Sequence, residues 1–110
     1  MKFGQTIGGQ NNMKSNKVFP DSLNTAVFTT KFIVQDKKEI TYVSHDFEDG
    51  AWQFFSDDNF DNYEEIAMIL SLDEIIQIDN SVLEIADLPL GSVATRRSKT
   101  DNWTITRNET

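Results

Sequence analysis

Apolar and polar side chains alternate along much of the first half of the chain, with the period of two that is typical of β-strands. Three such segments, rich in β-branched and aromatic residues, follow one another at residues 26–34, 39–46 and 51–56. Polar residues 35–38 separate the first two, and residues 47–50, in which Gly50 can take a positive φ, separate the last two. Both connections have the length of a hairpin turn. We therefore expect three consecutive antiparallel strands, a meander.

The second half changes to helical spacing after a short apolar run. Residues 66–70 are apolar throughout, which suits a strand buried on both faces as well as a stretch of buried helix, and we favour the strand. Two capping-box patterns follow, Ser71–Glu74 and Ser81–Glu84, and each predicts a short helix. Asp79-Asn80 separates these helices, and Pro89 is expected to stop the second. Their apolar faces consist of Leu72, Ile75 and Ile76, and of Val82, Ile85 and Ala86.

A closing hairpin is predicted from residues 91–97 and 103–107, joined by a turn at 98–102. The expected total is an antiparallel meander sheet of five to six strands with two short consecutive helices. Because strands and helices are segregated along the chain, the fold class is α+β. Residues 1–24, rich in Gly, Asn, Gln, Ser and Lys, predict a flexible polar N-terminal arm, and residues 25–110 a single α+β domain.

Charge is distributed unevenly over this pattern. The net charge is −8, and residues 39–95 contain fourteen acidic residues and no Lys or Arg. This argues against a nucleic-acid ligand, because phosphate binding requires a basic surface. A negative field of this kind attracts a basic protein partner, although a solvated acidic surface has the same composition. With no apolar run that could cross a bilayer, no secretory signal and no Cys, we expect a cytoplasmic protein that contacts no membrane.

Candidate catalytic groups are few. His45-Asp46 resembles the pairs of metal-dependent phosphohydrolases, but such sites need several imidazoles and carboxylates, and the chain has one His. On a strand these two side chains would also face opposite sides of the sheet. The chain has no Cys nucleophile, no Ser in a strand-to-helix elbow and no glycine loop that could bind phosphate. We therefore predict a protein that is not an enzyme, with no catalytic residues, no cofactor and no dedicated metal ligands.

An acidic loop at residues 57–65 leaves one alternative open. The D-x-N-x-D spacing at residues 57–61 copies the opening of an EF-hand, but Asn62 and Met68 stand where that loop requires Gly and Glu. The alternative to a protein-binding domain is thus a small regulatory domain that binds a divalent cation through this loop. The site would be weak and would not be an EF-hand.

Residues 46–65 combine eight carboxylates with six aromatic side chains. Trp52 and Phe54 share a strand face and are expected in the core, whereas Phe60 and Tyr63 stand in a polar loop and are expected to be exposed. Aromatic anchors with acidic neighbours are typical of protein interfaces. The predicted partner-binding residues are Asp46, Glu48, Asp49, Asp57, Asp58, Phe60, Asp61, Tyr63 and Glu64.

An ordered set of short motifs carries a resemblance to a known family. The motifs are D-G-x-W-x-F-x-S at residues 49–56, L-x-x-I at 72–75, Asp79, and L-P-x-G-S at 88–92. Over about residues 26–107 the chain resembles small bacterial proteins of unknown function that are grouped with the polymorphic-toxin immunity proteins, of the immunity protein thirty-three type. The resemblance implies an intracellular protein that neutralises a toxin by binding it, and it assigns no residues. Together with the charge, it leads us to expect a basic toxin domain as partner.

Overall fold

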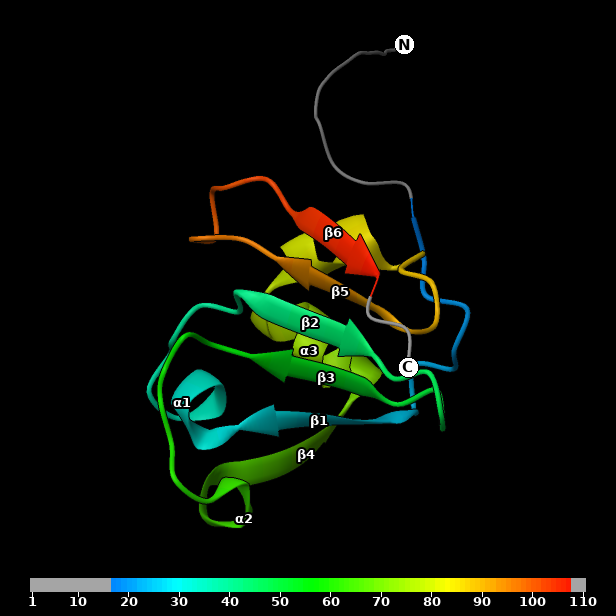
Figure 1. The fold of residues 1–110 in the computed structure, drawn as a ribbon. Helices are drawn as coiled ribbons and strands as arrows, with labels where there is room; N and C mark the ends of the chain where they lie inside the picture. The colour runs from blue at the N-terminus through cyan, green and yellow to red at the C-terminus, as the bar shows by residue number, and fades with distance from the viewer. Residues whose placement is uncertain (1–16, 108–110) are drawn as a thin grey trace, which may run out of the picture.

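The computed structural model describes residues 17–107, which form a six-stranded sheet with helices on one of its faces (Figure 1). The strand order is β4-β1-β3-β2-β5-β6. In the view of Figure 1, α3 lies behind the sheet, and the one-turn helices α1 and α2 lie at one end of the strands. None of the described helices is long and apolar enough to cross a membrane. The elements are β1 (Ala26–Thr30), α1 (Lys31–Val34), β2 (Tyr42–His45), β3 (Trp52–Phe55), α2 (Tyr63–Ile66), β4 (Ala67–Ser71), α3 (Leu72–Ile78), the 3₁₀ helix η1 (Asn80–Ile85), β5 (Ser92–Thr95) and β6 (Thr104–Arg107).

The α+β class is confirmed, but the predicted antiparallel meander is wrong, because β1 and β3 are parallel neighbours. The segment predicted as one strand over residues 26–34 divides at Lys31, where β1 ends and α1 begins. This turn of helix brings Ile33 into the core, with 1% of its surface exposed. The chain then forms β2, which leaves one strand position free between itself and β1. β3 occupies this position. No hairpin therefore forms across residues 35–38.

The other two predicted hairpins are confirmed. β2 and β3 pair antiparallel, with Val43 opposite Phe54, and the turn between them contains Gly50 at a φ of +73°. β5 and β6 pair antiparallel across residues 98–102. β5 also pairs with β2, so the two hairpins join in the middle of the sheet.

The apolar run at residues 66–70 forms a strand as predicted, apart from Ile66, which belongs to α2. The expected burial of this strand on both faces is wrong. β4 lies at the edge of the sheet and pairs with β1 alone, and 62% of the surface of Ile69 is exposed. An apolar run thus marks an edge strand here, with part of its hydrophobic surface facing solvent.

The two predicted capping boxes have different outcomes. The first is present: Ser71 Oγ accepts from Glu74 N at 3.1 Å, and Glu74 Oε1 accepts from Ser71 N at 2.8 Å, at the start of α3. The second is wrong. Asp79 caps η1 instead, since its Oδ1 accepts from Ser81 N at 3.0 Å and from Ser81 Oγ at 2.6 Å. η1 also ends at Ile85, before it reaches Pro89.

The core lies between the sheet and the layer formed by α3 and η1. Trp52 and Phe54 are fully buried in it, as predicted. The predicted inward faces of the helical segments are confirmed, with Ile76 only partly buried. Core residues contributed by these elements are Val27, Val43, Trp52, Phe54, Leu72, Ile75, Val82, Ile85, Ala86 and Ala94.

Part of the predicted arm, residues 17–24, contacts the domain. Phe19 is 7% exposed, and its ring meets the ring of Trp52 edge-on with the centroids 4.9 Å apart. Asp21 Oδ1 accepts from Trp52 Nε1 at 3.2 Å. Residues 1–16 of the arm and residues 108–110 lie outside the described residues, so the division into arm and domain stays a prediction.

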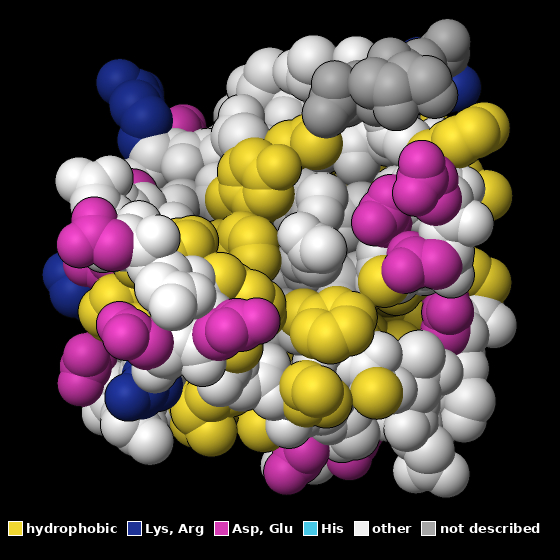
Figure 2. Space-filling model, turned by 60° about the horizontal axis from the view of Figure 1, so that its bottom comes forward, with side chains coloured by type: hydrophobic (Ala, Val, Ile, Leu, Met, Phe, Trp, Pro, Cys, Tyr) yellow, Lys and Arg dark blue, Asp and Glu magenta, His cyan; other side chains and the backbone are white. Residues whose placement is uncertain are grey.

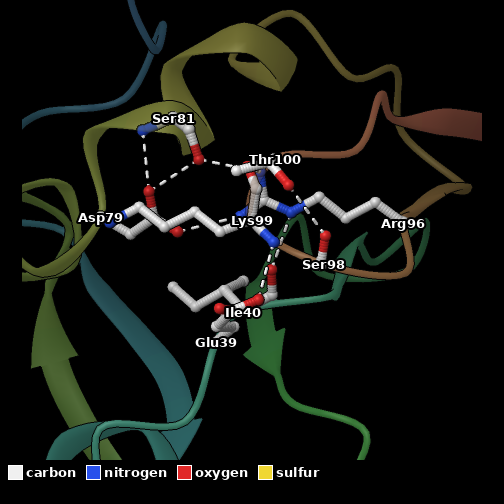
Figure 3. A network of polar contacts seen from close by, with 8 residues as sticks. All are labelled: Glu39, Ile40, Asp79, Ser81, Arg96, Ser98, Lys99 and Thr100. Carbon is white, nitrogen blue, oxygen red and sulfur yellow. Dashed lines mark hydrogen bonds and ion pairs between the residues drawn. The ribbon is translucent and has the colours of Figure 1, made fainter.

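A buried arginine joins three parts of the fold (Figure 3). The Arg96 guanidinium pairs with Asp79 at 2.9 Å, its Nε donates to Ile40 O at 2.9 Å, and its Nη1 donates to Ser81 Oγ at 2.9 Å. Both charged side chains of the pair are at most 5% exposed. Because Arg96 follows β5, this network ties the end of that strand to the α3–η1 junction. It also removes Asp79 from the acidic surface that the sequence suggested.

Candidate interaction surface

One face of the sheet packs against α3 and η1, and the opposite face, which we call the open face, is turned toward the viewer in Figure 1. The strand register identifies its residues, since Tyr42 lies opposite Phe55 and Thr95. Residues of the open face are half-buried or exposed, whereas the inner face of the central strands carries the fully buried Val43, Trp52, Phe54 and Ala94. Figure 2, in which the β4 edge of the sheet is turned forward, shows hydrophobic side chains in the middle of that side of the molecule, with Asp and Glu side chains on both sides of them. The open face includes Phe28, Tyr42, Ser44, Gln53, Phe55, Ile69, Val93 and Thr95.

Three residues of the predicted site, Asp46, Glu48 and Asp49, lie in the turn between β2 and β3. Two of their carboxylates bind the backbone of the turn itself: Asp46 Oδ1 accepts from Glu48 N at 3.3 Å, and Asp49 Oδ1 accepts from Ala51 N at 2.9 Å. Among residues 17–107, no Lys or Arg forms an ion pair with any of the three. We call these three residues the turn cluster. Two of its three carboxylates are thus held in place, and none of the three is in an ion pair with the described Lys and Arg residues.

Phe55 is the centre of an aromatic cluster at the other end of β3. Its ring centroid is 5.6 Å from that of Tyr63, 6.4 Å from that of Phe60 and 5.9 Å from that of Tyr42. The Tyr63 hydroxyl donates to Thr29 O at 3.1 Å, and burial raises the pKa of Tyr63 above its ordinary value of 10.0. Phe60 is 43% exposed, in line with the prediction, whereas Tyr63 is half-buried and bound to β1.

The remaining predicted carboxylates lie around this aromatic cluster. Asp58 is the most restrained, because its Oδ2 accepts from Ser56 Oγ at 2.7 Å and its Oδ1 lies 3.5 Å from Lys38 Nζ. The others are exposed and form no ion pair with the described residues. We call this group, together with its aromatic neighbours, the loop cluster. It consists of Asp57, Asp58, Phe60, Asp61, Tyr63 and Glu64.

The D-x-N-x-D spacing in this loop leads into a helix cap. Asn62 Oδ1 accepts from Glu64 N at 3.0 Å and thereby caps α2. In the described part of the chain, no three His, Cys, Asp or Glu side chains are placed to hold a metal ion. The cation alternative therefore has no preassembled set of ligands here, and it stays a hypothesis for a metal titration.

The turn cluster and the loop cluster lie at opposite ends of the strands. β3 runs from the first to the second, and the seven residues from Ala51 to Asp57 span about 20 Å in an extended chain. Basic residues are concentrated at the loop end, because α1, the start of β2 and the end of β5 all lie there. The structure thus divides the predicted site into two groups, of which the turn cluster has fewer positive neighbours. The basic residues of the loop end are Lys31, Lys37, Lys38, Arg96, Arg97 and Lys99.

Two hollows mark the open face, one on each side of Tyr42. The hollow beside the turn has a volume of about 260 Å³, and we call it the turn hollow. The hollow beside the loop has a volume of about 420 Å³, and we call it the loop hollow. The turn hollow is lined in part by Tyr42, Ser44, Asp46, Phe47, Glu48 and Gln53. The loop hollow is lined by Thr41, Tyr42, Phe55, Ser56, Asp57, Phe60, Thr95 and Arg96.

His45 has a structural environment. Its Nδ1 lies 2.7 Å from Leu88 O, so this nitrogen carries a proton and donates it to the carbonyl. The imidazole also stacks on Trp52 with 3.9 Å between ring centroids. The carboxylate of Asp46 binds the turn instead of the imidazole. The two residues thus do not form a dyad.

Tyr42 and Phe47 are among the residues of this surface that the predicted site does not include. Tyr42 lines both hollows, and Phe47 is 54% exposed at the turn. The ring of Phe47 lies against Gly91, where an added Cβ would be 3.4 Å from Phe47 Cδ1. An aromatic residue in a polar turn was the available signal for Phe47. The position of Tyr42 depends on the strand order, which the sequence does not show.

Comparison with known families gives one match. The family model described as the immunity protein Imm33 domain matches residues 27–106, which extends from β1 into β6. No curated protein and no solved structure matches the chain. The match confirms the resemblance inferred from the motifs.

Proposed function

The chain belongs to the Imm33 family of immunity proteins, and on this premise we propose that it neutralises a toxin by binding it through the open face of the sheet. Membership of the family gives the chain a toxin-neutralising role in general. The proposal adds a surface, a mode of action and a class of partner. The mode is binding without catalysis, in the cytoplasm, and the partner is a basic toxin domain.

The open face is the observation that carries this proposal. Phe60 and Phe47 expose 43% and 54% of their surface there, and Ile69 exposes 62% at the edge strand. Large apolar side chains that gather on one face and have polar groups around them are typical of a protein interface. Aromatic residues in such a position supply much of the binding energy when a partner covers them.

Charge supports a basic partner. The turn cluster carries carboxylates without positive neighbours in ion-pair range among the described residues, and the loop cluster adds exposed Asp57, Asp61 and Glu64. Negative charge at the rim of an interface accelerates the encounter with a positive partner and disfavours acidic ones. The same charge would oppose binding to nucleic acid or to an anionic membrane surface.

Co-expression with the toxin-like product of the adjacent gene tests the proposal. We expect the chain to restore growth of cells that produce this toxin, and the two proteins to purify together as a complex. If the two proteins do not purify together and toxicity is unaltered, the proposal is wrong.

A matched pair of variants tests the surface. Glu48→Lys reverses a charge in the turn cluster, whereas Glu84→Lys makes the same change on η1, in the layer on the other side of the sheet. We expect the first to slow association with the toxin about tenfold at low salt and the second to leave it nearly unchanged. Equal effects of the two variants would show that the net charge of the protein, and not the charge on the open face, sets the rate of association with the toxin.

A further inference from the structure

We propose that the turn hollow receives a Lys or Arg side chain and the loop hollow an apolar or aromatic one, both from a single continuous segment of the toxin. This inference rests on the proposed function and goes further, because it specifies the segment that the partner must present. The two hollows differ in the chemistry of their walls, and Tyr42 forms a wall of each.

The turn hollow has the chemistry of a site for a cation. Asp46 and Glu48 line it, and neither is paired with a Lys or Arg of the described chain. Ser44 Oγ donates to Gln53 Oε1 at 3.3 Å on its floor, so the polar side chains there are already oriented. Phe47 and Tyr42 add aromatic rings, whose faces attract a cation. A guanidinium or ammonium group would gain charge-assisted hydrogen bonds from both carboxylates.

The loop hollow has the chemistry of a site for an apolar side chain. The rings of Tyr42 and Phe55 stack at 5.9 Å, and Phe60 meets Phe55 at 6.4 Å and remains 43% exposed. Arg96 also lines the hollow, but its guanidinium is fully buried and paired with Asp79. Its charge therefore does not repel an apolar or a basic segment. An inserted aromatic or aliphatic side chain would remove the exposed face of Phe60 from water.

The distance between the hollows sets the spacing in the toxin segment. Gln53 of the turn hollow and Asp57 of the loop hollow are four residues apart on and just after β3, which corresponds to about 13 Å of extended chain. An extended segment would therefore place its basic and apolar side chains four residues apart. A helix would place them about nine residues apart, since it rises about 1.5 Å per residue.

Two synthetic peptides serve as probes, each with one Arg, one Trp and otherwise uncharged polar residues. One is extended, with Arg and Trp four residues apart, and the other is a cross-linked helix with the two nine residues apart. Amide shifts of the ¹⁵N-labelled full chain are followed up to millimolar peptide. We expect one of the peptides to shift amides around both hollows, at Ser44 and Gln53 and at Phe55 and Phe60. If neither peptide shifts both groups of amides, the proposal is wrong.

Variants of the protein assign each side chain to its hollow. Glu48→Lys should lower the affinity of the protein for the parent peptide about tenfold. A peptide with Arg→Glu should regain affinity for this variant. The Phe60→Ala variant should bind the parent peptide about tenfold more weakly than the wild type does. It should also bind the parent peptide and a Trp→Ala peptide with equal affinity. The control Glu84→Lys should bind like the wild type. Shifts that persist unchanged in Glu48→Lys and Phe60→Ala would overturn the assignment.

The toxin itself separates this inference from the proposed function. If the wild-type chain does not restore growth in the co-expression experiment, the proposed function fails. If the wild type restores growth and a Glu48→Lys/Phe60→Ala variant with an unchanged melting temperature restores it equally well, the function stands and the two hollows are not the site.

Discussion

The two acidic clusters of this protein both combine carboxylates with aromatic residues in the sequence, but they differ in their physical properties. In the turn cluster, Asp46 and Asp49 bind backbone amides of their own turn, and neither forms an ion pair with a described Lys or Arg. In the loop cluster, the chain is held by rings packed around Phe55, and Asp58 pairs with Lys38. The comparison teaches that a count of carboxylates along the chain does not measure surface charge. The position of each carboxylate relative to the bases of the fold decides it.

The largest expected difference between the two ends concerns the buried ion pair near the loop end. Arg96→Met leaves Asp79 buried without its partner, and we expect the free energy of unfolding to fall by about 3–5 kcal/mol. Native-state hydrogen exchange should accelerate more around β5 and η1 than around the turn cluster. Urea denaturation measures the first effect and amide exchange the second. The control Arg97→Met changes the adjacent residue, whose side chain is 92% exposed, and should change stability little. Equal losses in both variants would contradict the structural role of the network.

The turn end depends on backbone conformation. Gly91 has a φ of +80°, a conformation that strains an L-residue, and an added Cβ would contact the Phe47 ring at 3.4 Å, so Gly91→Ala should destabilise the protein by about 1–2 kcal/mol. Gly50 has a φ of +73° with no atom near the added Cβ, so Gly50→Ala should cost about 1 kcal/mol. Urea midpoints of the two variants test this order. A smaller loss for Gly91→Ala than for Gly50→Ala would mean that Phe47 moves freely away from Gly91.

At the loop end, a single hydroxyl ties α2 to β1. Tyr63→Phe removes its hydrogen bond to Thr29 O, and we expect a loss of about 1 kcal/mol near neutral pH. Because burial raises the pKa of Tyr63, the folded state keeps its proton above pH 10.0, where the unfolded state releases it. Stability of the wild type therefore falls as the pH rises above that value, and the Phe variant lacks this contribution. Urea unfolding at pH 7 and pH 10.5 measures the difference, and a gap between the two proteins that widens at high pH would contradict it.

The smallest expected effect on stability comes from making the loop cluster resemble the turn cluster. Lys38→Met removes the positive neighbour of Asp58 and should change the free energy of unfolding by less than about 1 kcal/mol, because the pair is partly exposed. It should nevertheless speed association with a basic partner at low salt, and the gain should vanish at high salt. Stopped-flow binding at two salt concentrations checks this. Unchanged rates would show that Asp58 lies outside the contact region.

Local signals in the sequence predicted local structure well. The alternation around Trp52 and Phe54 and the Gly50 turn predicted the β2–β3 hairpin, and Ser71 with Glu74 predicted the start of α3. The same pattern failed at Ser81, because its hydroxyl donates to Asp79, two residues earlier, and accepts from Arg96, which only the folded chain brings beside it. Local motifs predict local structure where no distant residue binds the side chains of the motif.

Strand order was not predictable from these signals. The parallel pairing of β1 with β3 depends on α1, the single helical turn that follows β1. This turn buries Ile33 in a core formed by residues far along the chain. An uninterrupted strand and a strand followed by one helical turn share the same apolar composition. For the interaction surface, the sequence therefore indicated acidic residues at both ends and two aromatic residues at the loop end, but not the separation of the two ends, nor Phe47 at the turn, nor Tyr42 between the two hollows.

The position of β3 between β1 and β2 has a consequence for synthesis on the ribosome. β1 is synthesised before either of its neighbours, β3 and β4. β2 can pair on its second edge only after β5 has been synthesised. Such long-range pairings form slowly compared with local ones. Both hollows also include residues of β5 or its flanks, up to Arg96. A nascent chain that ends before Ser92 therefore lacks one wall of each hollow, and the proposed surface is complete only after β5 has been synthesised.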